Sequence, residues 1–181
     1  MQTLKSNSVL VLAIITLAAF ARLVPSIPNF APITALAVFG GFAFFNKRLA
    51  YLVPMATMLV SDVILALIKN DWGYAFHSAQ IVVYLTLLAT VAISVFASRK
   101  QSVLSIAGST VIGSLLFFIT TNFAVWAMGT LYTHSLAGLG ECYVAAIPFL
   151  RNSFIADVMY VTAMFGVFAL LERSAFKPVK A

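Results

Sequence analysis

The stretch SVLSIAGSTVIGSLLFFITTNFAVWAMG, residues 102–129, decides the fold class of this chain. It runs for 28 residues without a charged side chain. A helix needs roughly 20 apolar residues to cross the hydrocarbon core of a bilayer. The stretch is therefore predicted to be a transmembrane helix.

Apolar runs of similar character recur along the whole sequence, with no linker that would divide it. The predicted spans are residues 8–24, 29–45, 49–68, 74–97, 102–129 and 152–171. We therefore predict an all-α integral membrane protein, one transmembrane domain over residues 1–181 built as a bundle of about six helices. The first run is interpreted as a retained helix, because no small-x-small cleavage site follows it.

The composition agrees with a lipid environment. Of the 181 residues, 62% are hydrophobic and 9% are charged, whereas soluble domains carry roughly 25% charged residues. The net charge of +6 comes from basic residues placed singly or in pairs between the apolar runs, which is typical of loops that set topology. Nucleic-acid binding is therefore not expected.

The single cysteine, Cys142, excludes an intramolecular disulfide and is interpreted as a packing residue.

The basic residues also predict the orientation, since they favour the cytoplasmic side. With six spans, one side carries eight of them and the other carries three: Lys5, Lys47, Arg48, Arg99, Lys100, Arg173, Lys177 and Lys180 against Arg22, Lys69 and Arg151. The expected location is the bacterial cytoplasmic (inner) membrane, with both termini in the cytoplasm.

The fairly apolar segment 131–150 is the alternative candidate for a seventh span. Counting it as a span reduces the charge bias to six against five, and it contains Glu141 and Pro148. We therefore expect residues 130–151 to form an outer loop that carries a short interfacial or re-entrant helix.

Polar residues inside predicted spans are costly and mark candidate functional sites. In this orientation they gather in the outer half of the membrane, among aromatic and Met side chains, as in small-molecule sites. The candidate substrate-binding residues are Asn29, Asp62, His77, Asn122, Trp126, Arg151 and Asp157. A structural alternative stays open, in which Asp62 pairs with Arg22 or Lys69 and Asp157 pairs with Arg151.

Small residues follow two of the spans at helical spacing. Ala31, Ala35 and Gly40 do so in the second span, and Ser105, Ser109 and Gly113 in the fifth. Such faces allow close contact between helices. They indicate packing within this bundle or docking of a partner membrane protein.

No sequence motif indicates catalysis. The chain has no His-Glu-x-x-His pattern, nucleophile elbow or phosphate-binding loop. No catalytic residue, metal site or cofactor is therefore predicted. An enzyme would have to use Asp62, His77 and Asp157 as a metal or acid–base site, and this is the third alternative.

Several segments together resemble a family of uncharacterised small bacterial membrane proteins. They are RLVPSIPNFAPITALAVFGG (22–41), SD (61–62), TNFAVW (121–126) and YTHSLAGLGECYVAAIPFLRN (132–152). More loosely, the Pro-opened second span with Pro32, Ala35, Ala37 and Gly40, followed by Asp62 late in the third, resembles the S components of energy-coupling-factor (ECF) transporters.

The second resemblance implies a substrate-binding subunit for a vitamin- or cofactor-sized molecule taken up from outside. It also implies a transmembrane coupling protein with cytoplasmic ATPases as partner. S components typically contact that partner through an Ala-x-x-x-Ala face on the first helix, and this spacing is absent from residues 8–24. The alternative function is a structural or accessory membrane protein, a scaffold whose polar residues form internal pairs.

Overall fold

The computed structural model describes residues 8–23 and 29–175, and the regular structure within these ranges is entirely helical, as expected. The described residues form seven helices: α1 (Ser8–Phe20), α2 (Ile33–Ala43), α3 (Lys47–Lys69), α4 (Trp72–Ala75), α5 (Gln80–Ala97), α6 (Val103–Met128) and α7 (Leu136–Ala175). The prediction for the two termini falls on residues 1–7 and 176–181, which lie outside the described ranges.

Four helices are long and apolar enough to cross a membrane: α3, α5, α6 and α7 as far as Glu172. The predicted spans 49–68 and 102–129 agree with α3 and α6 to within two residues at each end. The predicted span 74–97 is divided, since α4 is a single turn and α5 begins only at Gln80.

The first two predicted spans contain shorter helices. α1 has 13 residues and α2 has 11. At 1.5 Å per residue these lengths correspond to about 20 and about 17 Å, less than the roughly 30 Å of a hydrocarbon core. Within the predicted span 29–45, the helix itself covers only Ile33–Ala43.

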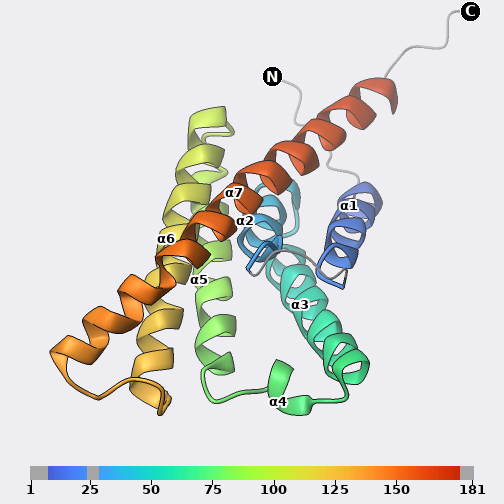
Figure 1. Cartoon of the computed structure of the whole chain (residues 1–181). Coiled ribbons are helices and arrows are strands. Elements are labelled where there is room, and N and C mark those ends of the chain that lie inside the picture. Colours follow the sequence, from blue (N-terminus) through green and yellow to red (C-terminus); the bar gives the residue numbers. More distant parts are fainter. Residues whose placement is uncertain (1–7, 24–28, 176–181) are drawn as a thin grey trace, which may run out of the picture.

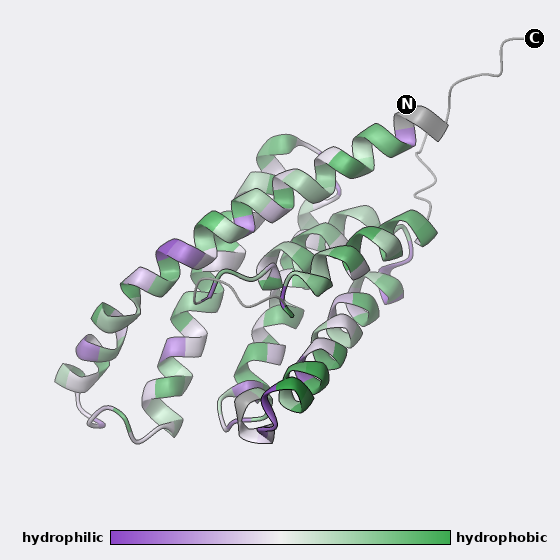
Figure 2. Cartoon of the chain, turned by 45° about the vertical axis from the view of Figure 1, so that its right-hand side comes forward, coloured by the Kyte–Doolittle hydropathy of each residue, from purple (hydrophilic) through white to green (hydrophobic). Residues whose placement is uncertain are grey.

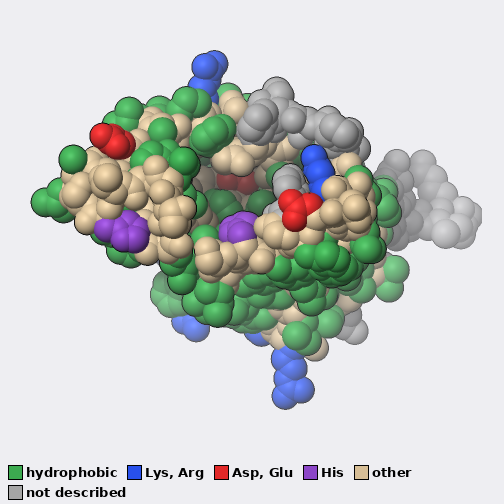
Figure 3. All heavy atoms as spheres, turned by 60° about the horizontal axis from the view of Figure 1, so that its bottom comes forward, with side chains coloured by type: hydrophobic (Ala, Val, Ile, Leu, Met, Phe, Trp, Pro, Cys, Tyr) green, Lys and Arg blue, Asp and Glu red, His purple; other side chains and the backbone are tan. Residues whose placement is uncertain are grey.

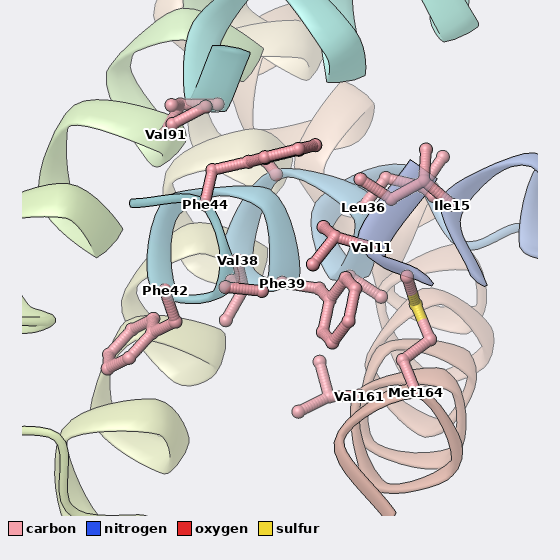
Figure 4. Close-up of a cluster of buried hydrophobic side chains, with 14 of the residues drawn as sticks. Val11, Ile15, Leu36, Val38, Phe39, Phe42, Phe44, Val91, Val161 and Met164 are labelled. Carbon is pink, nitrogen blue, oxygen red and sulfur yellow. The ribbon is translucent and has the colours of Figure 1, made fainter. Parts of the chain in front are cut away.

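The short helix α2 forms the centre of the bundle. Its residues from Thr34 to Ala43 are all buried, and it contacts α1, α3, α5, α6 and α7. Figure 4 shows its Phe39 among Val11, Val161 and Met164 from the surrounding helices. Phe39 also meets the ring of Phe165 edge-on, with the ring centroids 5.0 Å apart. A helix buried on all sides explains why this stretch has almost no polar residues.

Two glycines allow the neighbouring helices to approach α2 closely. A Cβ atom added at Gly40 would lie 2.7 Å from Cγ of Pro54 on α3. One added at Gly41 would lie 2.5 Å from Cβ of Ser94 on α5. Real carbon atoms pack about 3.5–4.0 Å apart, so these contacts require glycine.

The outside of the bundle is largely apolar. Figure 2 shows hydrophobic residues along the helices and hydrophilic ones mainly at their connections. Large side chains such as Leu52, Ile81 and Leu170 are 64%, 62% and 65% exposed. An exposed apolar surface of this extent is that of a protein in contact with lipid or with a partner.

The 40-residue helix α7 is the largest departure from expectation. Residues 136–151, expected in an outer loop, continue without interruption into the predicted sixth span, and only residues 129–135 form a connection. Pro148 lies inside this helix. At 1.5 Å per residue α7 is about 60 Å long, and Figure 1 shows it running diagonally across α5 and α6.

The connections divide between the two ends of the bundle. One end, here called the α4 end, carries α4, the last turn of α3, the start of α5 and the α6–α7 connection (Figure 1). The other end carries the α5–α6 turn and is called the α5–α6 end. The α2–α3 connection belongs to the α5–α6 end, because Nζ of Lys47 lies 3.5 Å from Oγ of Ser98.

Candidate functional site

A buried polar cluster near the α4 end centres on Asp62 of α3. Arg22, which follows α1, pairs with it at 2.9 Å from Nη2 to Oδ1. Gln80 and Tyr84 of α5 donate to its other oxygen, Oδ2, at 2.7 and 2.8 Å. The side chains of Arg22 and Asp62 are only 9% and 3% exposed. The cluster therefore joins the end of α1 to α3 and α5.

Helical spacing explains why these groups converge. Gln80 and Tyr84 are four residues apart and lie on the same face of α5. On α3, Met58 lies one turn before Asp62 and Ser61 directly precedes it. Arg22 donates to the side chains of both through Nη1. A buried ion pair is tolerated when further hydrogen bonds satisfy its remaining polar atoms, and the partners of Asp62 do so.

The face at the α4 end is hollowed. Figure 3 shows a hollow near its middle, with histidine at its margin and an acidic side chain at its floor. Among the described acidic residues, Asp62 and Asp157 are the two that are buried. The hollow thus lies at the same end of the bundle as the Asp62 cluster.

Asp157 of α7 has a different environment, because its partners are neutral. Oγ of Ser114 on α6 lies 2.6 Å from its Oδ2, and the Thr34 hydroxyl and the Ala35 backbone N–H also donate to it. The latter two groups belong to the first turn of α2, whose own N-cap residue, Pro32, provides no capping side chain. Asp157 therefore caps α2 from a neighbouring helix, and an acidic group is favourable at this end of a helix.

The structure answers the open question about pairing. Asp62 pairs with Arg22, which was one of the two expected structural partners. Asp157 is bound by Ser114, Thr34 and Ala35, and Arg151 is exposed on the surface of α7. Asp157 is thus hydrogen-bonded by neutral donors, where the sequence had suggested an ion pair with Arg151.

Asn122 and Trp126 lie away from the Asp62 cluster and organise the α6–α7 connection. The Trp126 indole N–H donates to the Thr133 carbonyl at 2.9 Å, and its ring contacts His134 edge-on. Asn122 donates to the Phe118 carbonyl of its own helix at 2.8 Å, and its backbone carbonyl accepts from Sγ of Cys142 at 3.4 Å.

His77 and Asn29 are both exposed. His77 directly precedes α5, and its carbonyl accepts the Gln80 backbone N–H at 2.9 Å. Asn29 adopts a left-handed conformation with φ of 59° and accepts a hydrogen bond from Ser153 through its carbonyl. In the hydrogen bonds and the ion pair described above, the candidates bond to other residues and not to one another.

The small residues lie mostly inside the bundle. Ala35, Gly40, Ser109 and Gly113 are buried, and Ala31 and Ser105 are half-buried. A Cβ atom at Gly113 would lie 2.8 Å from the methyl groups of Thr34 on α2 and Thr90 on α5. These faces hold α2, α5 and α6 together.

The sequence reasoning missed Gln80, Ser61, Ser114 and Thr34 as members of the polar clusters. Gln80 could have been found, because an amide at the first turn of an apolar helix and a Tyr four residues later share a face. Ser114 and Thr34 carried no such signal, since hydroxyls in apolar helices commonly bond their own backbone. Within the described ranges, no three His, Cys, Asp or Glu residues are grouped to hold a metal ion.

Comparisons with known proteins identify a family and no function. The model of a family described as "Family of unknown function (DUF6580)" matches residues 2–179, and the chain belongs to this family. No curated protein and no solved structure matches the chain.

Proposed function

We propose that this member of the DUF6580 family is the substrate-binding membrane subunit of an uptake system, of the type represented by ECF S components. It would bind a small vitamin- or cofactor-like molecule that enters the hollow at the α4 end. The observation that supports this most is the buried Arg22–Asp62–Gln80–Tyr84 cluster near that hollowed face. A few converging polar groups within an apolar bundle are the usual composition of a ligand site.

The membrane location is supported by the four long apolar helices and the exposed apolar surface. The α5–α6 end carries Lys47, Arg48, Arg99 and Lys100. We assign this end to the cytoplasmic side and the α4 end to the outside, because basic residues favour the cytoplasm. In this proposal α1 and α2 contribute to a bundle of about six helices in the bacterial inner membrane.

The cluster has hydrogen-bonding capacity for a ligand. An ionised carboxylate offers about four acceptor positions, and described residues donate to Asp62 three times. The Gln80 amide also has a carbonyl oxygen, and the Tyr84 hydroxyl oxygen can accept while it donates. A ligand with hydrogen-bond donors could therefore bind here without breaking the Arg22–Asp62 pair.

Uptake driven by ATP would need hydrolysis by a partner, since no nucleotide-binding motif is present in this sequence. The proposal therefore includes a transmembrane coupling protein with cytoplasmic ATPases, and the chain itself acts as a binding subunit and not as an enzyme.

A structural or accessory role is the second candidate, and one specific observation favours it. Both buried carboxylates are bonded within the chain, Asp62 to Arg22, Gln80 and Tyr84, and Asp157 to Ser114 and the start of α2. In a scaffold these contacts would serve only to hold the helices together.

The substrate-binding function and the scaffold function predict different results when the protein is purified. Only a substrate-binding protein should retain a small molecule. The protein is purified in mild detergent and denatured, and the released small molecules are identified by mass spectrometry. The control is an unrelated membrane protein purified from the same cells. A polar molecule enriched only with this protein supports the binding function, and its absence from repeated preparations supports the scaffold.

A further inference from the structure

The α5–α6 end carries a cluster of positive charge. Lys47 reaches Ser98, which brings the α2–α3 connection beside the α5–α6 turn with Arg99 and Lys100. The side chains of Lys47, Arg48, Arg99 and Lys100 are all exposed. Neither connection contains an acidic residue. This end therefore presents four cations, two in the first turn of α3 and two in the adjoining α5–α6 connection.

An apolar groove begins beside this cluster. It lies between α6 and α7 and has a volume of about 320 Å³. The residues that line it include Val103, Ile106 and Ala107 on α6, and Val161 and Phe165 on α7. Val103 is the first residue of α6, three positions after Lys100. The groove thus starts next to the cations and continues towards the middle of the bundle.

We propose that the groove and the cations together form a binding site for an anionic phospholipid. The phosphate would be bound by Lys100 and Arg99, and one acyl chain would lie in the α6–α7 groove. An anionic phospholipid matches both halves of the surface, because its charge complements the cations and its chain matches the apolar lining. Basic pockets beside transmembrane helices bind such headgroups. The inference rests on the membrane location and is independent of any ligand at the α4 end.

The geometry favours Lys100 as the principal headgroup contact. Lys47 is already directed towards Ser98, and the Arg99 guanidinium lies 5.0 Å from the centroid of the Phe96 ring. Lys100 precedes the groove most closely in the chain, and Val103 and Leu104 beside it are 83% and 81% exposed. A lipid at this position would cover these two side chains.

The test measures lipid binding to the full-length protein in detergent by native mass spectrometry. The probes are phosphatidylglycerol and phosphatidylcholine with identical acyl chains. Each cation near an anionic headgroup contributes about fivefold in affinity. We expect phosphatidylglycerol to bind at least about fivefold more tightly than phosphatidylcholine. Lys100→Gln should lower this ratio of affinities by about fivefold. Lys69→Gln, the same change at the α4 end, should leave it intact.

A second pair of variants tests the groove. Ala107 lines the groove, whereas Ala92 is exposed on α5 outside it. Ala107→Trp should weaken binding of phosphatidylglycerol and phosphatidylcholine alike, and Ala92→Trp should weaken neither.

Any of four results in the lipid-binding assay would overturn the proposal. They are equal affinity for the two lipids, equal losses in Lys100→Gln and Lys69→Gln, unchanged binding in Ala107→Trp, and competition by the chain-free headgroup glycerophosphoglycerol at the same concentrations as the lipid. A change of oligomeric state in Ala107→Trp without loss of lipid would assign the groove to a second copy of the chain, which also overturns it.

Discussion

Arg22 and Asp62, forty residues apart in the chain, form a buried ion pair that connects the end of α1 to α3. The contact is extended by Gln80 and Tyr84, so that α5 joins the same cluster. Three helices are thereby connected near one end of the bundle by one carboxylate, whichever function the cluster serves.

The first prediction concerns the loss of one partner of this pair. Arg22→Met leaves the buried Asp62 carboxylate without its cation and should destabilise the protein by about 3–5 kcal/mol. The double variant Arg22→Met/Asp62→Leu removes both charges and should recover most of the loss. Thermal unfolding in detergent measures both. Equal destabilisation of the single and double variants would show that the pair is not buried as described.

Asp157 gives a second prediction through its contact with the start of α2. Asp157→Asn keeps an oxygen that can accept from the Ala35 N–H, whereas Asp157→Leu leaves the first turn of α2 and Ser114 without this acceptor. Loss of an N-cap costs about 0.5–2 kcal/mol. Asp157→Leu should therefore unfold at a lower temperature than Asp157→Asn. The reverse order would argue against the capping role.

Two glycines, Gly41 on α2 and Gly166 on α7, give a third prediction, because alanine should have different effects at the two positions. In Gly41→Ala the new Cβ would lie 2.5 Å from Cβ of Ser94, and overpacking typically costs about 1–3 kcal/mol. Gly166→Ala on α7 meets no atom within 4 Å and should be neutral or stabilising by up to about 1 kcal/mol. Unfolding curves of the two variants compare them directly. A stable Gly41→Ala protein would contradict the close packing of α2 against α5.

The length of α7 can be measured with a pair of spin labels. Ala137 and Met159 are both exposed and lie 22 residues apart on this helix. A continuous helix places their backbones about 33 Å apart. Double electron–electron resonance in a Cys142→Ala background should give a narrow distribution near this distance. A broad distribution, or one centred well below about 25 Å, would restore the outer loop expected from the sequence.

The sequence predicted the parts of the fold that depend on hydropathy alone. The bounds of α3 and α6 agree closely because a long uncharged run has few alternatives to a helix. Hydropathy does not reveal how much of an apolar run is helical, so the 11-residue length of α2 was missed. Glu141 and Pro148 indicated a loop, yet α7 passes through both of them.

The candidate site was predicted only in part, because pairing depends on three-dimensional proximity. Asp62 and its possible partner Arg22 were identified from their cost in a membrane. Gln80 joins them only because α5 packs beside α3. Trp126 contacts the α6–α7 connection and Asn122 contacts Cys142 of α7, which spacing within α6 could not show.

The central claim is that a small molecule binds at the Asp62 cluster, and the most direct measurement compares two tyrosine variants. Tyr84→Phe removes a hydroxyl from the cluster. The control, Tyr143→Phe, removes a hydroxyl that donates to the carbonyl of Ile119 on α6, at a distance of 2.7 Å. The amount of co-purified molecule per protein is then determined by mass spectrometry. The account predicts a loss of about tenfold in Tyr84→Phe, as for one hydrogen bond to a charged group, and wild-type amounts in Tyr143→Phe. Equal amounts in both variants, or no molecule with the wild-type protein, would contradict it.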